Sequence, residues 1–283
     1  MSTIAVIGSV NLDMVATVKK LPAPGETVTD AELNRFPGGK GANQALAARR
    51  LGADVQLFAC VGDDAAADEA LALLREGGVD LSHVVVADDK PTGTALIAVA
   101  PSGENHIVVA PGANRSLTPD RFTVPDGDAL ICQLEVPTDT VAHAAERFGG
   151  FFCVNLAPAK QVDVTVLQRA DLVVVNEIEA AWYGETLNAC PGMIVTTVGA
   201  AGATITQGGE DIAVARPPRV DVVDTTAAGD TFTAALTVAL VEGQSPQAAL
   251  EFACAAGAAA CTKLGAQPSL PTRDEVESLR TVS

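Results

Sequence analysis

The chain has 283 residues, of which 48% are hydrophobic and 4% aromatic, and its formal net charge is −17. This amount of apolar sequence is sufficient for a large buried core, and the length fits one domain or one domain with a small appendage. The excess of acidic residues argues against a nucleic-acid partner, because a protein that binds a phosphate backbone needs a basic surface. The best candidate for a basic cluster in this sequence is only the pair Lys19-Lys20.

We expect neither an export signal nor a membrane span in this sequence. The N-terminus, MSTIAVIGSVNLD, lacks the basic start and the long apolar stretch of a signal peptide. Apolar segments near the C-terminus are interrupted at 242–246, too soon to span a bilayer. The six cysteines show no CxxC spacing, and we predict reduced, buried thiols rather than disulfides or zinc ligands. We therefore expect a cytoplasmic protein with no membrane partner.

Short β-branched runs alternate with Ala- and Leu-rich segments along most of the chain. Strands are predicted at 4–8, 55–61, 129–134, 152–154, 172–175, 194–197 and 220–223. Helices are predicted at 42–51, 64–76 and 231–241, from Ser245-Pro246 onward, and after the capping box Thr272-x-x-Glu275. The alternation predicts an α/β protein with a Rossmann-like, three-layer α/β/α body and a mostly parallel central sheet.

Two stretches depart from this alternation. Residues 12–37 are extended and punctuated by Pro and Gly, and residues 92–111 read as a β-hairpin about a Pro-Ser-Gly-Glu turn. We expect them to form a small antiparallel β-sheet that acts as a lid over a site. Since no repeat or linker is visible, residues 1–283 are predicted to form a single domain with this lid as a sub-domain.

The segment VDVVDTTAAGDTFTAAL (220–236) carries the strongest chemical signal. A Thr-Thr-Ala-Ala-Gly turn leads into a helix with Asp230 in its first turn. Small residues permit close approach of a ligand, and free amides at a helix start attract an anion. A carboxylate beside such an anion hole suits phosphoryl transfer to an alcohol. The alternative is an acidic residue that only complements the helix dipole.

Two further turns follow the first strands. The loop PGGKGANQ (37–44) opens a helix but is not a Walker A motif, and no GxGxxG follows the first strand, so a dinucleotide-dependent oxidoreductase is not supported. Asn11 and Asp13 alternate after the first strand, where open α/β sheets bind ligands. They are candidates to bind hydroxyl groups, and an Asx-turn is the alternative.

Polar residues also follow later strands. Glu135 follows one strand, Asn176 and Glu179 follow another, and a small-residue turn occupies 197–203. Each of these features is also compatible with an ordinary helix cap or turn.

Four blocks occur together and in order: PGGKGANQA (37–45), GENHIVV with PGAN (103–114), DTTAAGDTF (224–232) and GAQPSLP (265–271). Through them the chain resembles the ribokinase/fructokinase superfamily of carbohydrate kinases, from residue 8 to residue 271. The resemblance implies a ribokinase-like fold and roles for individual positions. The implied sugar-binding residues are Asn11, Asp13, Gly39, Lys40, Asn43, Glu135 and Asp230.

The resemblance implies that Asp230 is the catalytic base and that backbone amides form the anion hole, at Ala227, Ala228 and Gly229. The implied ATP-binding residues are Asn176, Thr197, Gly199, Gly202, Gly229 and Cys254. The implied ligands of a monovalent cation, usually K⁺, are Asp224, Thr226, Ala260, Thr262, Gly265 and Ser269. Glu179 matches a position that organises Mg²⁺ through water.

The function implied by the resemblance is ATP-dependent phosphorylation of D-ribose at O5, with Mg²⁺ and K⁺ as cofactors and a homodimer formed through the lid. A kinase of the same family for 2-deoxyribose, fructose or a nucleoside is an alternative. A non-catalytic sugar-binding regulator is a second alternative, although such a protein should have lost the base or the anion hole.

Overall fold

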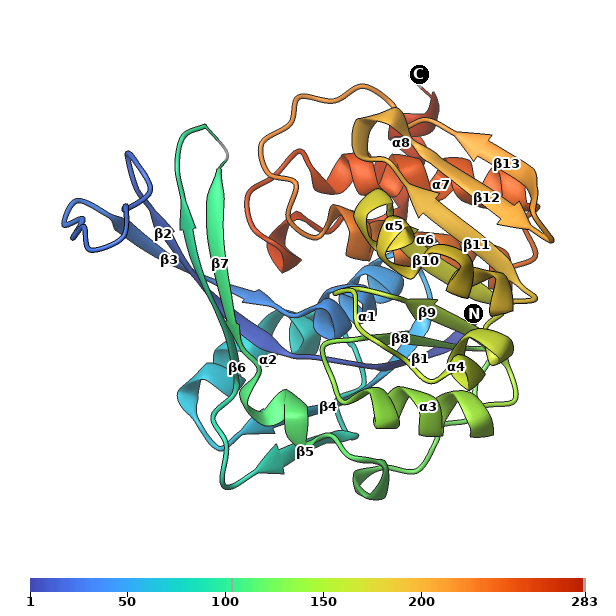
Figure 1. Cartoon of the computed structure of the whole chain (residues 1–283), viewed down its shortest axis with the longest axis horizontal. Coiled ribbons are helices and arrows are strands. Elements are labelled where there is room, and N and C mark those ends of the chain that lie inside the picture. The colour runs from blue at the N-terminus through green and yellow to red at the C-terminus, as the bar shows by residue number, and fades with distance from the viewer. Residues whose placement is uncertain (103, 282–283) are drawn as a thin grey trace.

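The computed structural model of the chain describes residues 1–102 and 104–281. It consists of a body built on a nine-stranded sheet and a four-stranded sheet that projects from one side (Figure 1). Gly103, which belongs to the predicted hairpin turn and to one of the four blocks, lies outside the described residues.

The strands are β1 Thr3–Ile7, β2 Asn11–Thr17, β3 Glu32–Gly38, β4 Asp54–Gly62, β5 Val84–Ala87, β6 Gly93–Val99, β7 Asn105–Ala110, β8 Ala129–Gln133, β9 Phe151–Asn155, β10 Leu172–Asn176, β11 Met193–Thr197, β12 Ala203–Gln207 and β13 Glu210–Ala215. The α-helices are α1 Lys40–Arg50, α2 Ala65–Glu76, α3 Thr138–Arg147, α4 Val164–Arg169, α5 Glu177–Tyr183, α6 Ala228–Val241, α7 Pro246–Ala260 and α8 Arg273–Thr281.

The large sheet has the order β13-β12-β11-β10-β9-β8-β1-β4-β5. Strands from β11 to β5 pair in parallel, and β12 and β13 add an antiparallel hairpin at one edge. Alternate side chains enter opposite cores: in β1, Ile4 and Val6 face one core, and Ala5 and Ile7 face the other. Burial on both faces explains why these strands read as continuous apolar runs.

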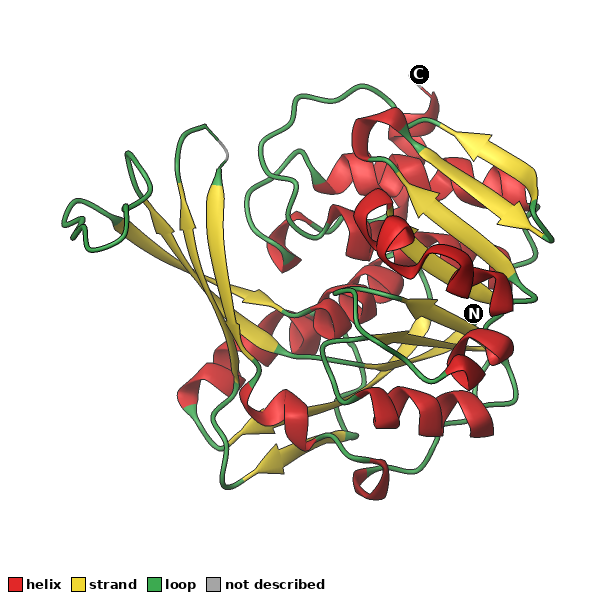
Figure 2. Ribbon diagram, viewed as in Figure 1, coloured by secondary structure: helices red, strands yellow, loops and turns green. Residues whose placement is uncertain are grey.

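Helices cover both faces of the large sheet (Figure 2). Residues of α1, α2, α6, α7 and α8 form the core of one face, and residues of α3, α4 and α5 form the core of the other. The three-layer α/β/α body and its mostly parallel sheet are therefore confirmed.

The projecting sheet has the order β3-β2-β6-β7. Its outer pairs β3–β2 and β6–β7 are antiparallel, as expected, whereas the central pair β2–β6 runs parallel. The two stretches predicted to form the lid thus come together in one sheet, because β2 begins immediately after β1 and β6 returns alongside it. The β2 end nearest the body is buried and its far end is exposed.

One predicted strand is wrong. Residues 220–223 form no strand; the side chains of Val222 and Val223 are exposed, and the amide of Val223 donates to the carbonyl of Cys261 at 2.8 Å. Pro217 and Pro218 precede this segment and lack the N–H donors that a strand requires. The helix that follows begins at Ala228, three residues before its predicted start.

All six cysteines are free; five are buried, as predicted, whereas Cys261 is half-buried. Over the part of the chain that the structure describes, no helix has the length and apolar character needed to cross a bilayer.

Candidate active site

Asp230 lies in the first turn of α6 and is 7% exposed. Its Oδ2 accepts a hydrogen bond from Asn43 Nδ2, and its Oδ1 accepts one from Gln44 Nε2, both at 2.9 Å. Both donors lie on α1, the helix that the glycine-rich loop opens. The fold therefore joins two motifs that are almost 190 residues apart in the sequence, and it fixes both oxygens of the carboxylate.

The charges around Asp230 oppose one another. Burial is the largest effect on the pKa of Asp230 and raises it, and the Glu135 carboxylate raises it further. The Lys40 ammonium and the hydrogen bonds from Asn43 and Gln44 lower it. The net result is a pKa above the ordinary value of an aspartate. Burial alone would lower the pKa of Lys40, but the carboxylates of Asp230, Glu135 and Glu179 outweigh it, and the pKa of Lys40 is raised. A charged lysine thus stands among the carboxylates of the site.

The other predicted sugar-binding residues line the same place. Asn11 and Asp13 lie on β2 and are buried, so the alternative of an Asx-turn is wrong. Glu135 Oε2 accepts from Ser9 Oγ at 2.5 Å and from the Lys40 amide at 3.1 Å. Burial, together with the nearby carboxylates of Glu135 and Asp230, raises the pKa of Asp13 to about 7. The site is rich in acceptors, which suits a ligand that donates hydroxyl groups.

Glycine in the 37–44 loop allows the backbone to approach these side chains. A Cβ on Gly38 would lie 2.2 Å from Asp13 Oδ2. Gly39 has φ 90°, and a Cβ there would lie 2.7 Å from the Asn11 amide nitrogen. Any other residue would displace the polar groups of β2, so these glycines shape the site through the space they leave.

The turn before α6 has the properties of an anion hole. Ala227 has φ 61°, a left-handed conformation that is uncommon for a residue with a side chain. The amide of Ala228 makes only a long hydrogen bond of 3.3 Å, to the Thr225 carbonyl. Among the described residues, no hydrogen bond engages the amides of Ala227 or Gly229. Donors beside a helix start and next to Asp230 can therefore bind an anionic group.

Asn176 and Glu179 form a reciprocal capping box at the start of α5. Asn176 Oδ1 accepts from the Glu179 amide at 2.8 Å, and Glu179 Oε2 accepts from the Asn176 amide at 2.9 Å. The helix-cap alternative is therefore a real structural role. The Glu179 carboxylate is also close enough to Lys40 to raise its pKa, so its charge reaches the site.

The predicted ATP-binding residues lie at the ends of β10 and β11, in the turn before β12, in the first turn of α6 and on α7. Asn176 and Thr197 are register partners at those strand ends. Gly199 has φ 48° and Gly202 has φ 108°, and a Cβ on Gly202 would lie 2.1 Å from the Ala215 carbonyl oxygen. Cys254 Sγ, on α7, lies 3.9 Å from that same oxygen. The structure thus brings both Gly202 and Cys254 close to the carbonyl group at the end of β13.

The predicted cation ligands lie on two loops that pack together. Asp224 Oδ1 accepts from the amide and hydroxyl of Thr226, at 2.9 and 2.6 Å, and Asp224 Oδ2 accepts from the Gly265 amide at 2.9 Å. These bonds hold residues 224–226 against 260–269, which also carry Ala260, Thr262 and Ser269. Carboxylate, hydroxyl and carbonyl oxygens suit a hard cation.

Within residues 1–102 and 104–281, no cluster of three or more His, Cys, Asp or Glu side chains suited to a metal occurs. A Mg²⁺ ion that is held mainly through water and phosphate oxygens requires no such cluster.

The sequence is similar to those of known proteins over nearly the whole chain. The model of the pfkB family carbohydrate kinases matches residues 1–273. The ribokinase of Bacillus subtilis (strain 168) is 38% identical over 293 aligned residues, which cover 99% of each protein. The chain belongs to the pfkB family of carbohydrate kinases. It is therefore a phosphotransferase.

Solved structures of ribokinases support the assignment of the chain to this family. The crystal structure of ribokinase from Thermotoga maritima has a TM-score of 0.91 and 33% identity, and the match covers 99% of this chain and 100% of that one. The structure of Arabidopsis thaliana ribokinase complexed with ribose and ATP has a TM-score of 0.87 and 28% identity, covering 100% and 99% of the two chains.

Several polar residues around the kinase site were not predicted from the sequence. Asn114 Nδ2 donates to Asn11 Oδ1 at 2.7 Å and so orients a predicted sugar-binding side chain. Ser9 orients Glu135 in the same way. Gln133 and Asn155 end β8 and β9 as register partners, and both are buried. A polar residue that ends a buried strand was the available signal, since open α/β sheets place ligands at that edge.

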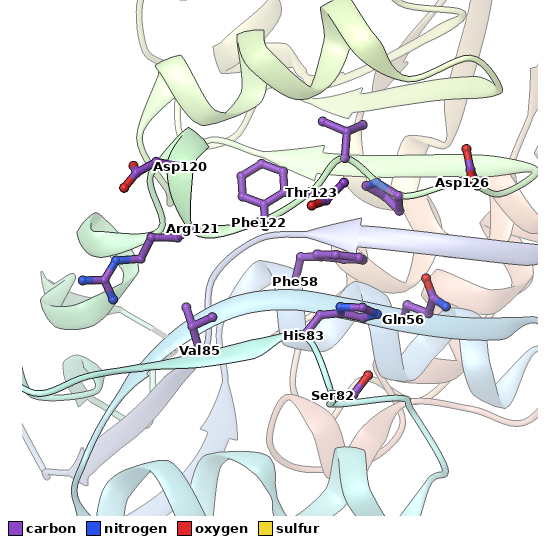
Figure 3. Close-up of a pocket in the computed structure, with 12 residues that line it drawn as sticks. Gln56, Phe58, Ser82, His83, Val85, Asp120, Arg121, Phe122, Thr123 and Asp126 are labelled. Atoms are coloured by element: carbon purple, nitrogen blue, oxygen red, sulfur yellow. The ribbon is translucent and has the colours of Figure 1, made fainter.

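The kinase also contains a cavity of about 650 Å³ away from these residues, lined by β4, by residues just before and in β5, and by the 120–126 segment (Figure 3). The rings of Phe58 and His83 stack there with centroids 4.3 Å apart, and Phe122 meets Phe58 edge-on. None of the predicted site residues lines this cavity.

Proposed function

We propose that this kinase transfers the γ-phosphate of ATP to the O5 hydroxyl of D-ribose, producing ribose 5-phosphate and ADP. The observation that carries the proposal is the placement of Asp230, a buried carboxylate fixed by two amides and adjacent to open backbone donors. This arrangement matches what transfer to an alcohol needs: a base for the hydroxyl proton and donors for the charge on the transferring group. The similarity to a ribokinase that was solved with ribose and ATP supports the choice of both substrates.

In this proposal the sugar hydroxyls donate to the carboxylates and amides of β2, α1 and Glu135. Asn43 supplies a specific supporting feature: its Nδ2 is committed to Asp230, and its Oδ1 is buried with no partner among the described residues. An unpaired buried acceptor is costly, and a hydroxyl of a bound sugar would satisfy it. Lys40 would offset part of the negative charge that the three carboxylates and the phosphates bring together.

Asp230 would take the O5 proton as the hydroxyl attacks. The amides of Ala227, Ala228 and Gly229 would stabilise the negative charge that develops on the transferring phosphoryl group. Gly199, Gly202, Thr197, Asn176 and Cys254 would bind the nucleotide. Glu179 would help to hold Mg²⁺ through water, and bound Mg²⁺ would neutralise phosphate charge. The loops 224–226 and 260–269 would hold K⁺ with oxygen ligands, and they would thereby support the turn before α6.

Another acceptor remains the main alternative, because a pocket rich in acceptors also accommodates 2-deoxyribose, fructose or a nucleoside. A panel of these acceptors at equal concentration, assayed by ADP release with and without K⁺, separates the possibilities. We expect the highest kcat/KM for ribose and an increase with K⁺. A higher kcat/KM for another acceptor would overturn the ribose assignment, and equal rates without any sugar would overturn the kinase mechanism.

We also propose a homodimer formed through the lid sheet. Leu33, Leu96 and Val108 share one face of that sheet by strand register, and they are 61%, 54% and 63% exposed. Apolar side chains clustered on a thin projecting sheet would be buried by a second copy. Light scattering after gel filtration should give twice the monomer mass for the wild type and the monomer mass for Val108→Lys. A monomeric wild type at micromolar concentration would refute the dimer.

Six free cysteines, of which five are buried, support a reducing compartment, and we propose the cytoplasm.

A further inference from the structure

A chain of buried side-chain amides lies behind Asp230. Gln44 Nε2, besides its bond to Asp230, donates to Asn155 Oδ1 at 3.2 Å, and Gln44 Oε1 accepts from Gln133 Nε2 at 2.6 Å. Gln44 and Gln133 have no exposed surface, and Asn155 is 7% exposed. Of the two amides that bind Asp230, Gln44 is therefore the one sealed from the ligand.

A backbone group determines the orientation of Asn155, the amide at one end of this chain. The carbonyl of Val174, on β10, can only accept, so Asn155 Nδ2 donates to it, at 3.1 Å. Asn155 Oδ1 is then the end that faces Gln44, and it requires the Gln44 amide nitrogen as its donor. From the other side, Gln133 donates to Gln44 Oε1. Both neighbours thus direct the nitrogen of Gln44 toward Asp230.

The backbone makes room for this chain. A Cβ on Gly8 would lie 2.0 Å from Gln133 Oε1 and 2.6 Å from the Cα of Gly41. Gly8 does not have a positive φ, so glycine is required there for space rather than for conformation. Gly8 therefore leaves space both for the Gln133 side chain and for the first turn of α1.

We propose that Gln44 is a positioning residue for the catalytic base: held in its donor orientation by Asn155 and Gln133, it fixes Asp230 Oδ1 and stabilises the negative charge of the carboxylate. The proposal rests on the role of Asp230 as the base. In this role Gln44 contacts neither the sugar nor the nucleotide, and it acts only through Asp230.

The charged groups that face Asp230 make this donor important. Glu135, after β8, favours the protonated form, as does burial, and Asp13, on β2, lies close enough for Asp230 to raise the pKa of Asp13. Lys40 and the amides of Asn43 and Gln44 favour the ionised form. Removal of the Gln44 donor should therefore raise the pKa of Asp230. Since the base must be ionised to act, the fall in activity on acidification then begins at a higher pH than in the wild type.

The experiment measures the pH dependence of kcat and of KM for ribose in the full-length kinase. In Gln44→Met, which has a similar length but no donor, we expect kcat at neutral pH to fall about 10-fold or more, as for the loss of a hydrogen bond to a charged group. The acid limb of the kcat profile should move to higher pH, and KM for ribose should stay near its wild-type value. Gln133→Met should shift the acid limb in the same direction by less, and the double variant should be no worse than Gln44→Met.

Thr140→Val is the matched control. It removes a buried hydroxyl that donates to the Leu117 carbonyl at 2.5 Å, on the opposite face of the sheet, and should lower stability without moving the acid limb. If Gln44→Met does not fold, Gln133→Met decides the question because it leaves the Asp230 contact intact. If every variant that folds, Gln44→Met or Gln133→Met, keeps the acid limb of the wild type, the positioning role of Gln44 is overturned while Asp230 can still be the base. Substantial turnover by Asp230→Asn would instead overturn the assignment of Asp230 as the base.

Discussion

The two halves of the site are built from different materials. The half proposed to bind the sugar uses buried side chains, among them Asp13, Asn43 and Asp230, each held by specific hydrogen bonds or close packing. The half proposed to bind the nucleotide and the cation relies more on backbone groups and on glycines with positive φ, such as Gly199 and Gly202, although the Asp224 and Glu179 carboxylates also lie there. The first half therefore depends on which functional groups are present, and the second depends on the path of the main chain.

This difference determines how each half responds to mutation. A substitution in the sugar half should change chemistry while the fold persists, because the side chains project from rigid strands and helices. A substitution in the nucleotide half should act through backbone conformation, and a change as small as one methyl group should be sufficient. Substitutions in each half test this contrast, beginning with the largest expected effect.

Asp230→Asn should abolish most of the chemistry and leave the fold intact. Loss of a general base typically costs about 10²- to 10⁴-fold in rate, and asparagine has nearly the shape of aspartate. Steady-state kinetics should show the loss in kcat, while circular dichroism and ribose binding by calorimetry should remain close to wild type. A variant that retains wild-type kcat would contradict the role of Asp230 as base.

Gly202→Ala should damage the nucleotide half specifically. Gly202 has φ 108°, and the added Cβ would lie 2.1 Å from a backbone oxygen, so we expect the free energy of unfolding to fall by about 2–3 kcal/mol and KM for ATP to rise. Gly208→Ala is the matched control, because Gly208 lies in the β12–β13 turn, has φ 61°, and a Cβ added there would meet nothing within 4 Å. It should cost only about 1 kcal/mol. Equal effects on KM for ATP and KM for ribose would contradict the division into two halves.

Asp13→Asn should weaken sugar binding and, at alkaline pH, increase the free energy of unfolding. The pKa of Asp13 is raised from 3.8 to about 7, so between these values the unfolded chain releases a proton that the folded chain retains. Wild-type stability therefore falls as pH rises through this range, and the deficit persists above pH 7.

The asparagine variant lacks this deficit. Chemical denaturation should show it to be more stable than wild type at pH 8 by on the order of 2 kcal/mol, with little difference at pH 4 and a raised KM for ribose. A stability difference that does not change with pH would show that Asp13 is not protonated in the folded kinase.

Much of the fold could be predicted from the sequence because buried parallel strands are apolar runs with helices between them. The failure at 220–223 arose because a β-branched run usually marks a strand, whereas here two prolines precede it and the Val223 amide bonds to the Cys261 carbonyl. The β12–β13 hairpin was overlooked, although Gly208-Gly209 separates two stretches of alternating residues and is a typical hairpin turn.

The site was predictable only in part. Asp230, Lys40 and Asn43 stand in motifs whose residue types already indicate chemistry. Gln133 and Asn155 do not, because an amide at a strand end becomes informative only when its distant partner is known. The meeting of Gln44 with Asp230 joins two helices that no local pattern relates.

The central claim is that the sugar half presents the primary hydroxyl of ribose to Asp230. The most direct test is to identify the product made from ribose and ATP by ³¹P and ¹³C NMR, comparing the wild type with Asp230→Asn. We predict that the wild type produces ribose phosphorylated at O5 and that the variant produces almost none. Phosphorylation at another hydroxyl, or comparable product formation by the variant, would contradict the account.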